Sequence, residues 1–174
     1  APDEGPVVEV LGPLGPNRLV LACEHASSFI PEALQDLGLA PEDRYSHAAW
    51  DPGARDLAVA LATALNAPLV ASRVSRLVFD CNRSEGAQSA TPRQSERVTV
   101  PGNSNLTRDE KSFRFKIFGE PFHQALESAL TVAASEAALV TIHTFTPLYH
   151  GAPLDVVIGI LYDQNPRTAP APQP

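Results

Sequence analysis

Three short segments place side chains that can bind a metal where a predicted strand ends or a predicted helix begins. His25 follows the apolar residues 18–22, His143 follows a second apolar stretch at residues 138–142, and Asp51 stands at an expected helix start. In open α/β sheets, ligands bind at the carboxyl ends of the strands, so we expect these three side chains to meet there. Two imidazoles and a carboxylate, with a fourth position left for water, form the ligand set of a catalytic zinc site.

Each of these residues also has an ordinary structural explanation. Asp51, directly before a proline, is a normal helix N-cap, and His143 fits a histidine that is hydrogen-bonded at a strand end. His25 is harder to explain by packing, because Glu24 precedes it and Ala-Ser-Ser follows it. His47, four residues before Asp51, is a supporting group or an alternative ligand. Glu24 and His47 are therefore candidate catalytic residues.

A second group of polar residues ends the segment Arg-Leu-Val-Phe-Asp-Cys-Asn-Arg at residues 76–83. Its apolar middle predicts a strand that delivers polar side chains to its carboxyl end. An arginine can clamp a carboxylate with two parallel hydrogen bonds, and an asparagine adds a further donor. The candidate substrate-binding residues are Arg76, Asp80, Asn82 and Arg83. The alternative is a surface ion pair between Asp80 and Arg83 that holds the following loop.

Composition narrows the classes of partner. The chain has 174 residues, of which 44% are hydrophobic, enough for one packed core. It has no apolar run of the ~18 residues that a membrane span needs. A net charge of -7 without a Lys or Arg cluster argues against a nucleic-acid or anionic membrane partner. We expect a small-molecule substrate with carboxylate groups and, because two cysteines are too few for a disulfide scaffold and no signal peptide is visible, a cytoplasmic protein.

The hydrophobic pattern predicts an α/β domain spanning residues 1–174. Residues 1–17, rich in Pro and Gly, predict an irregular lead-in. Residues 54–65 predict a helix whose apolar face carries Leu57, Leu61 and Leu65. Short strands are expected at residues 68–71 and 77–79, and this strand, helix, strand order favours a parallel arrangement with crossovers.

The second half of the chain begins with a polar stretch, residues 84–105, whose length indicates a functional loop such as a lid. Thr107 and Glu110 form a capping box for a helix that runs to about residue 135, with a bend expected at Pro121.

Strands are expected at residues 138–143 and 155–161, and the proline-rich tail at 165–174 can continue neither strand nor helix. A sheet that ends on a strand without a covering helix leads us to expect a domain that lacks its C-terminal part. An uncovered edge strand can pair with a second copy of the chain, so the prediction includes a homo-oligomer.

Several motifs, in order, resemble those of the N-formylglutamate amidohydrolase family. They are Cys-Glu-His-Ala-Ser at 23–27, His-Ala-Ala-Trp-Asp-Pro-Gly-Ala at 47–54, Arg-Leu-Val-Phe-Asp-Cys-Asn-Arg at 76–83, Val-Pro-Gly-Asn at 100–103, Pro-Phe-His at 121–123 and Ile-His-Thr-Phe at 142–145. The resemblance implies a three-layer α/β/α sandwich like that of the zinc carboxypeptidases. It also implies release of formate from N-formyl-L-glutamate, a late step in one route of histidine breakdown.

The resemblance also implies roles for particular residues. In the related murein amidases, two histidines and a carboxylate in the order of His25, Asp51 and His143 hold zinc, although another divalent metal fits the same ligands. The stretch at residues 80–83 is similar to the substrate-carboxylate grip of aspartoacylases and carboxypeptidases, which supports Asn82 and Arg83 as the clamp.

The sequence departs from that wider group in one respect. Its members use a glutamate near the carboxyl terminus as the general base, and this chain has no glutamate after His143. Of the later carboxylates, Asp155 begins a predicted strand and Asp163 ends it, so Asp163 is the candidate at the active edge. The leading hypothesis is a zinc-dependent amidohydrolase like N-formylglutamate deformylase. The alternatives are an amidase of the same fold acting on another N-acyl amino acid or a cell-wall peptide, and an inert protein that binds an acidic metabolite.

Overall fold

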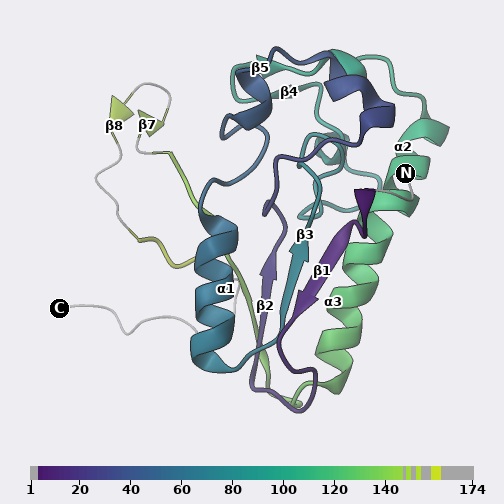
Figure 1. The fold of residues 1–174 in the computed structure, drawn as a ribbon. Coiled ribbons are helices and arrows are strands. Elements are labelled where there is room, and N and C mark those ends of the chain that lie inside the picture. Colours follow the sequence, from purple (N-terminus) through teal and green to yellow (C-terminus); the bar gives the residue numbers. More distant parts are fainter. Residues whose placement is uncertain (1–3, 147, 150–151, 154–157, 162–174) are drawn as a thin grey trace.

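A four-stranded mixed sheet forms the centre of the computed structural model, which describes residues 4–146, 148–149, 152–153 and 158–161 (Figure 1). The strands, in the spatial order β1-β3-β2-β6, are β1 (Val8–Leu11), β3 (Leu69–Ser72), β2 (Leu19–Cys23) and β6 (Ala138–Thr141). β2 pairs in parallel with both β3 and β6, whereas β1 runs antiparallel to β3. The predicted α/β class is confirmed, and of the two predicted arrangements, a mostly parallel or a mixed central sheet, the structure has the mixed one.

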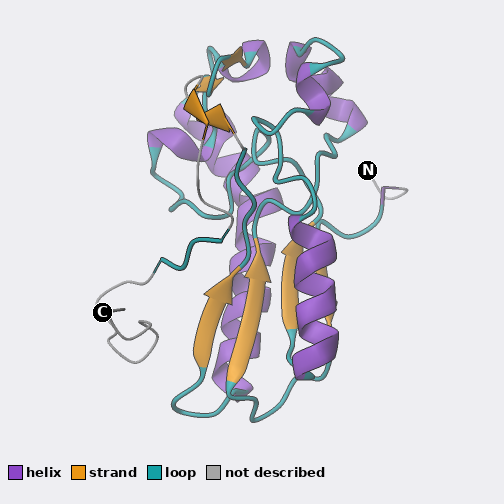
Figure 2. Cartoon of the chain, turned by 90° about the vertical axis from the view of Figure 1, so that its left-hand side faces the viewer, coloured by secondary structure: helices purple, strands orange, loops and turns teal. Residues whose placement is uncertain are grey.

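The apolar sequence of β2 reflects burial on both faces of the sheet. Val20 and Ala22 pack in the cluster that includes side chains of α3 (Glu120–Val132). Leu21 and Cys23 pack in the opposite cluster, against α1 (Ala54–Leu65). A strand buried on both faces reads as a continuous apolar run rather than an alternating one. One helix therefore covers each face of the sheet (Figure 2).

Helix α1 has the predicted bounds, but of the predicted apolar face only Leu61 packs against the core cluster. Ala54, Ala58 and Ala62 are buried against the sheet, whereas Leu57 and Leu65 are 48% and 55% exposed. The leucine stripe and the alanine stripe are adjacent on the helix surface, because they differ by one position in the sequence. The small alanine side chains allow the helix backbone to approach β2 and β3, with which α1 makes its contacts.

The long helical segment after residue 107 begins with the predicted capping box. The Thr107 hydroxyl accepts a hydrogen bond from the Glu110 amide, and the Glu110 carboxylate accepts one from the Thr107 amide. α2 (Arg108–Arg114) continues into a π-helical turn, η6 (Phe115–Gly119), and then into α3. The irregularity lies directly before the predicted bend at Pro121, whose missing amide hydrogen interrupts the regular ladder.

Two predictions of local structure are wrong. Within the predicted irregular lead-in, Val8–Leu11 forms β1, which pairs with β3 along its whole length. The predicted strand at residues 77–79 is instead a buried turn, in which the Val78 amide donates to the Ser75 carbonyl. The apolar side chains there reflect burial, which a turn can supply as well as a strand.

The loops gather at the end of the sheet to which the parallel strands point (Figure 2). The predicted polar loop of residues 84–105 contains a small hairpin and two short helices. The short elements are η2 (Glu32–Gly38), η3 (Asp43–Tyr45), η4 (Gln88–Ala90), β4 (Gln94–Ser95), β5 (Val98–Thr99), η5 (Pro101–Asn103), β7 (Leu148–Tyr149) and β8 (Ala152–Pro153).

The last predicted elements lie largely outside the described residues. Residues 158–161 of the predicted strand form no strand, whereas residues 155–157 and the tail at 165–174 are not among those described. Cys23 and Cys81 are buried free thiols, and burial raises the pKa of each to about 12. Among the described residues, no helix has both the length and the apolar character needed to cross a bilayer.

Candidate functional site

The three predicted metal ligands meet at the carboxyl edge of the sheet. His25 lies two residues after the end of β2, and His143 lies two residues after the end of β6. Asp51 lies before α1, and its amide donates to the His25 carbonyl at 3.0 Å. The N-cap residue of α1 is Gly53, with a φ of 81°, and no side chain caps the helix. The Asp51 carboxylate is therefore available to the histidines.

The ligand atoms of these residues converge on a small volume. One nitrogen or oxygen from each of His25, Asp51 and His143 lies within 4.8 Å of the others. Oδ2 of Asp51 is 2.8 Å from Nδ1 of His143 and 3.4 Å from Nδ1 of His25. The imidazole ring centroids are 4.8 Å apart. His25 and Asp51 are buried, whereas His143 is exposed, so the cluster opens to solvent on the His143 side.

Unsatisfied polar atoms test whether a metal fits this cluster. Nδ1 of His25, Oδ1 of Asp51 and Oε2 of Glu24 are buried and have no hydrogen-bond partner in the described structure. An unpaired buried polar atom costs about 1–3 kcal/mol, so native proteins seldom keep one without a reason. A divalent cation would supply the missing partner for imidazole nitrogen and carboxylate oxygen. The donor set therefore fits zinc or a similar metal.

Asp80 orients the first histidine. Its Oδ1 accepts a hydrogen bond from Nε2 of His25 at 2.8 Å, and both side chains are only 4% exposed. Because Nε2 is occupied, Nδ1 is the nitrogen of His25 left for a metal. A carboxylate behind a ligating histidine is a recurrent arrangement in metal sites. The structure thus places Asp80, predicted as a substrate-binding residue, against His25, where it holds the ring.

The carboxylates and histidines of the cluster stabilise one another's charged forms. Burial would raise the pKa of Asp51 and of Asp80, but hydrogen bonds from the histidines outweigh it and hold both below the usual value. For His25, burial would lower the pKa, but the neighbouring carboxylates of Asp51 and Asp80 outweigh it and raise the pKa. Arg76, another predicted substrate-binding residue, lies 3.2 Å from Asp80 and 3.7 Å from Asp51. The guanidinium therefore offsets part of the negative charge of both carboxylates.

The two candidate catalytic residues inside the described structure also border the cluster. Oε2 of Glu24 lies 3.5 Å from Nε2 of His143, and the Glu24 side chain is 5% exposed. His47 lies beside Asp51, with Nε2 3.8 Å from Oδ1. Asp163, the third candidate, is outside the described residues.

Asn82 and Arg83 lie apart from the cluster. Both are exposed, and neither side chain forms a hydrogen bond or ion pair with His25, Asp51 or His143 in the described structure. The Asn82 amide donates to Oδ1 of Asp80, and the Arg83 guanidinium donates to the Asn82 carbonyl. The chain therefore passes from the buried Asp80 to the exposed Asn82 and Arg83 within three residues.

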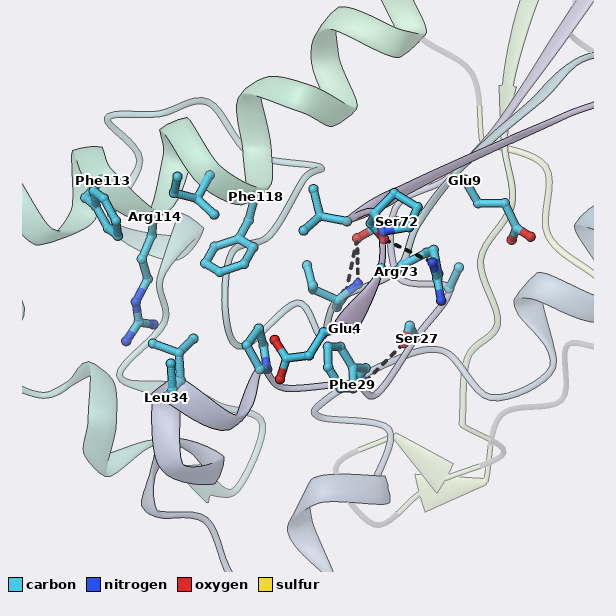
Figure 3. A pocket seen from close by; sticks show the side chains of 18 of the residues that line it. Glu4, Glu9, Ser27, Phe29, Leu34, Ser72, Arg73, Phe113, Arg114 and Phe118 are labelled. Carbon is cyan, nitrogen blue, oxygen red and sulfur yellow. Dashed lines mark hydrogen bonds between the residues drawn. The ribbon is translucent and has the colours of Figure 1, made fainter. Parts of the chain in front are cut away.

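A large apolar hollow is lined by residues other than those of the cluster, and Figure 3 shows its lining side chains. It has a volume of about 1160 Å³ and lies between the residues after β2 and the α2–η6 segment. Phe29, Phe113 and Phe118 are among its apolar lining residues, and no residue of the metal cluster lines it. A large volume alone therefore does not identify this hollow as the site of the chemistry.

Sequence reasoning missed one residue at the edge of the site. Glu96, in the turn between β4 and β5, lies 3.1 Å from Nδ1 of His47. It precedes the Val-Pro-Gly-Asn motif at residues 100–103, but an exposed glutamate in a polar loop carries no signal of its own. Only the folding of the hairpin over residues 47 and 48 reveals the contact.

Comparison with known proteins places these observations in a family. The family model described as N-formylglutamate amidohydrolase matches residues 17–172. The crystal structure of gene product Atu2144 from Agrobacterium tumefaciens is 40% identical in sequence, with a TM-score of 0.89. The match covers 96% of this chain and 68% of that one. No curated protein shows a significant match.

Proposed function

This chain belongs to the N-formylglutamate amidohydrolase family, and we propose that it hydrolyses the amide bond of N-formyl-L-glutamate with a divalent metal, zinc, held by His25, Asp51 and His143. The convergence of these three side chains, with buried unsatisfied atoms on His25 and Asp51, carries the proposal. A site stabilised by hydrogen bonds alone would not leave those atoms unpaired. As parts of the same proposal, the fold is related to that of the zinc carboxypeptidases, and the enzyme acts in the cytoplasm in histidine breakdown.

A bound zinc ion would polarise the formyl carbonyl and lower the pKa of a water molecule. The other roles fall to this chain's own residues. Asp80 holds the ring of His25 through Nε2, and Arg76 offsets the charge of the two buried carboxylates. Glu24, buried beside His143 with an unpaired oxygen, is the described carboxylate best placed to accept a proton.

The substrate's carboxylates need cationic partners outside the cluster. Arg83 is exposed and has no carboxylate partner among the described residues, and Asn82 lies beside it. We assign these two residues to binding a substrate carboxylate by a paired hydrogen-bond geometry. Because a formyl group is small, selectivity would come mainly from these carboxylate contacts.

Metal content is the first test. We expect about one zinc per purified chain by elemental analysis, and loss of the metal in His25→Ala and in His143→Ala. His123→Ala is the matched control, because Nε2 of His123 contacts the Cys81 carbonyl rather than the cluster. A wild type that stays free of metal after zinc is supplied would overturn the assignment.

Substrate choice is the second test. Formate release from N-formyl-L-glutamate should exceed release from N-formyl-L-leucine, and Arg83→Met should reduce that preference by raising KM for the glutamate substrate. Hydrolysis of N-acetyl-L-glutamate at an equal or higher rate would favour another N-acyl amino acid. Metal binding without turnover of any of these compounds would favour an inert binding protein for an acidic metabolite.

A further inference from the structure

His47 joins three segments at the edge of the metal cluster. Nδ1 lies 3.1 Å from the Glu96 carboxylate, and Nε2 lies 2.9 Å from the carbonyl oxygen of Thr144. Thr144 directly follows His143, and Asp51 is 3.8 Å from the same Nε2. The orientation of this one ring therefore affects both the residue after one candidate ligand and the surroundings of another.

The β4–β5 hairpin presents Glu96 to His47. Oγ of Ser95 donates to the Ala48 carbonyl at 2.9 Å, which ties the hairpin to the residue after His47. The Gln94 side chain donates to the Glu96 carbonyl at 3.0 Å and supports the turn from within. These two hydrogen bonds fix the backbone on either side of the Glu96 side chain.

Glu96 has an unfavourable backbone conformation. Its φ is 52°, in the left-handed region, where a residue with a Cβ atom costs about 1–2 kcal/mol relative to the right-handed region. Glycine adopts this conformation without that cost. A glutamate at such a position gives up stability, which is expected when its side chain has a task.

We infer that Glu96 is a positioning residue of the candidate site, which holds the His47 ring so that Nε2 faces the Thr144 carbonyl beside His143. The carboxylate accepts from Nδ1 and fixes the rotation of the imidazole. Through the ring, it constrains the backbone that carries His143. A displacement of about 1 Å at reacting groups can cost about 100-fold in rate, so loss of this constraint is expected to lower kcat. The expected effect on turnover rests on the proposed function, whereas the effect on the His47 ring does not.

The strained backbone provides a way to separate this role from a structural one. Glu96→Gly removes the carboxylate and also relieves the left-handed strain, so its Tm should equal or exceed that of the wild type. Its kcat should nevertheless fall about 10-fold, with KM within twofold, as for other residues that support metal ligands. Glu96→Gln keeps an oxygen that can accept from Nδ1, so its kcat should lie between the kcat of the wild type and that of Glu96→Gly. Arg97→Gly is the matched control, since Arg97 is exposed, adjacent, and not at positive φ.

The His47 ring itself provides a measurement that needs no substrate. Long-range proton–nitrogen NMR of the histidine side chains, with His47 identified by its loss in His47→Gln, should show a shifted Nδ1 resonance in Glu96→Gly and none in Arg97→Gly. If the wild type hydrolyses nothing, the proposed function fails, but a shifted resonance still supports the positioning role. An unchanged resonance in Glu96→Gly, or a loss of kcat that only follows a loss of Tm, would overturn the inference.

Discussion

Two buried polar networks in this protein differ in how completely their hydrogen bonds are satisfied. In the first, the fully buried Asn103 donates to the carbonyls of Leu77 and Pro92 and accepts from Arg114 at 2.6 Å. Arg114 also donates to the carbonyls of Val78 and Gly102. In the second, around His25 and Asp51, buried atoms stay unpaired.

The difference separates a structural network from one built for a ligand. Three of the four buried side-chain atoms without a partner in the described structure belong to Glu24, His25 and Asp51. None belongs to Asn103 or Arg114. Since a fully connected polar network stabilises the fold and a partly connected one weakens it, the first should matter most for folding. The second should matter most for binding.

The largest expected effect is on stability in the first network. Asn103→Ala removes the donor of the Leu77 and Pro92 carbonyls and one of the acceptors of Arg114, which should lower the free energy of unfolding by about 3 kcal/mol or more. Urea unfolding in a chelating buffer measures it. Asn105→Ala, at a nearby exposed position, should change the same quantity by less than about 0.5 kcal/mol. A loss below about 1 kcal/mol in Asn103→Ala would remove the contrast between the networks.

Metal addition should act on the second network alone. Zinc at a free concentration 100 times its Kd should raise the free energy of unfolding by about 2.7 kcal/mol in the wild type. Asn103→Ala should start lower and gain the same increment, because its site is intact. His25→Ala should gain nothing. Equal stabilisation of His25→Ala would show that zinc binds elsewhere on the chain.

Asp80 tests whether the support of a ligand can be separated from the ligand itself. Asp80→Ala removes the hydrogen bond to Nε2 of His25 but leaves all three candidate ligands in place. Metal affinity, measured by competition with a chelator of known Kd, should fall about 10- to 100-fold. Asp109→Ala, at an exposed position of α2, should bind metal as the wild type does. Unchanged affinity in Asp80→Ala would mean that His25 is held by packing.

Part of the candidate site and part of the fold could be predicted from the sequence. His25, Asp51 and His143 were identifiable because parallel strand ends meet at one edge, and the structure brings them together. The capping residues Thr107 and Glu110 were identifiable because a cap is a local pattern. These predictions depend only on chain direction and on neighbours within a few residues.

The remaining features depend on contacts between distant segments. Leu57 is more hydrophobic than Ala58, yet Ala58 is buried, because the sheet lies close to the helix. The turn at residues 76–80 could not be distinguished from a strand, because its amides find partners such as the Ala90 carbonyl. Asp80 and Glu96 have no pattern that indicates a partner 55 or 49 residues away. Their roles become visible only when the loops are in place.

The smallest expected effect is a difference in pH dependence between the networks. In metal-free protein, the pKa of Asp80 is lowered from 3.8, so its contribution to stability is present above that pH and is lost as pH falls through the folded value. The pKa of His25 is raised from 6.5, so its contribution is present below that pH and is lost as pH rises through the folded value. The hydrogen-bonded pair should therefore contribute most between about pH 4 and 6.5.

Asp80→Asn should accordingly cost most stability near pH 5.5 and less at pH 3.5 and 8.5, as measured by urea unfolding in a chelating buffer. The cost of Asn103→Ala should be the same at all three values, because an amide does not titrate and arginine stays protonated. Both variants replace one partner of a buried hydrogen bond, so a general effect of pH on unfolding cancels in the comparison. A cost of Asp80→Asn that is equally flat would show that the His25–Asp80 contact does not depend on charge, and the distinction between the two networks would then rest on metal binding alone.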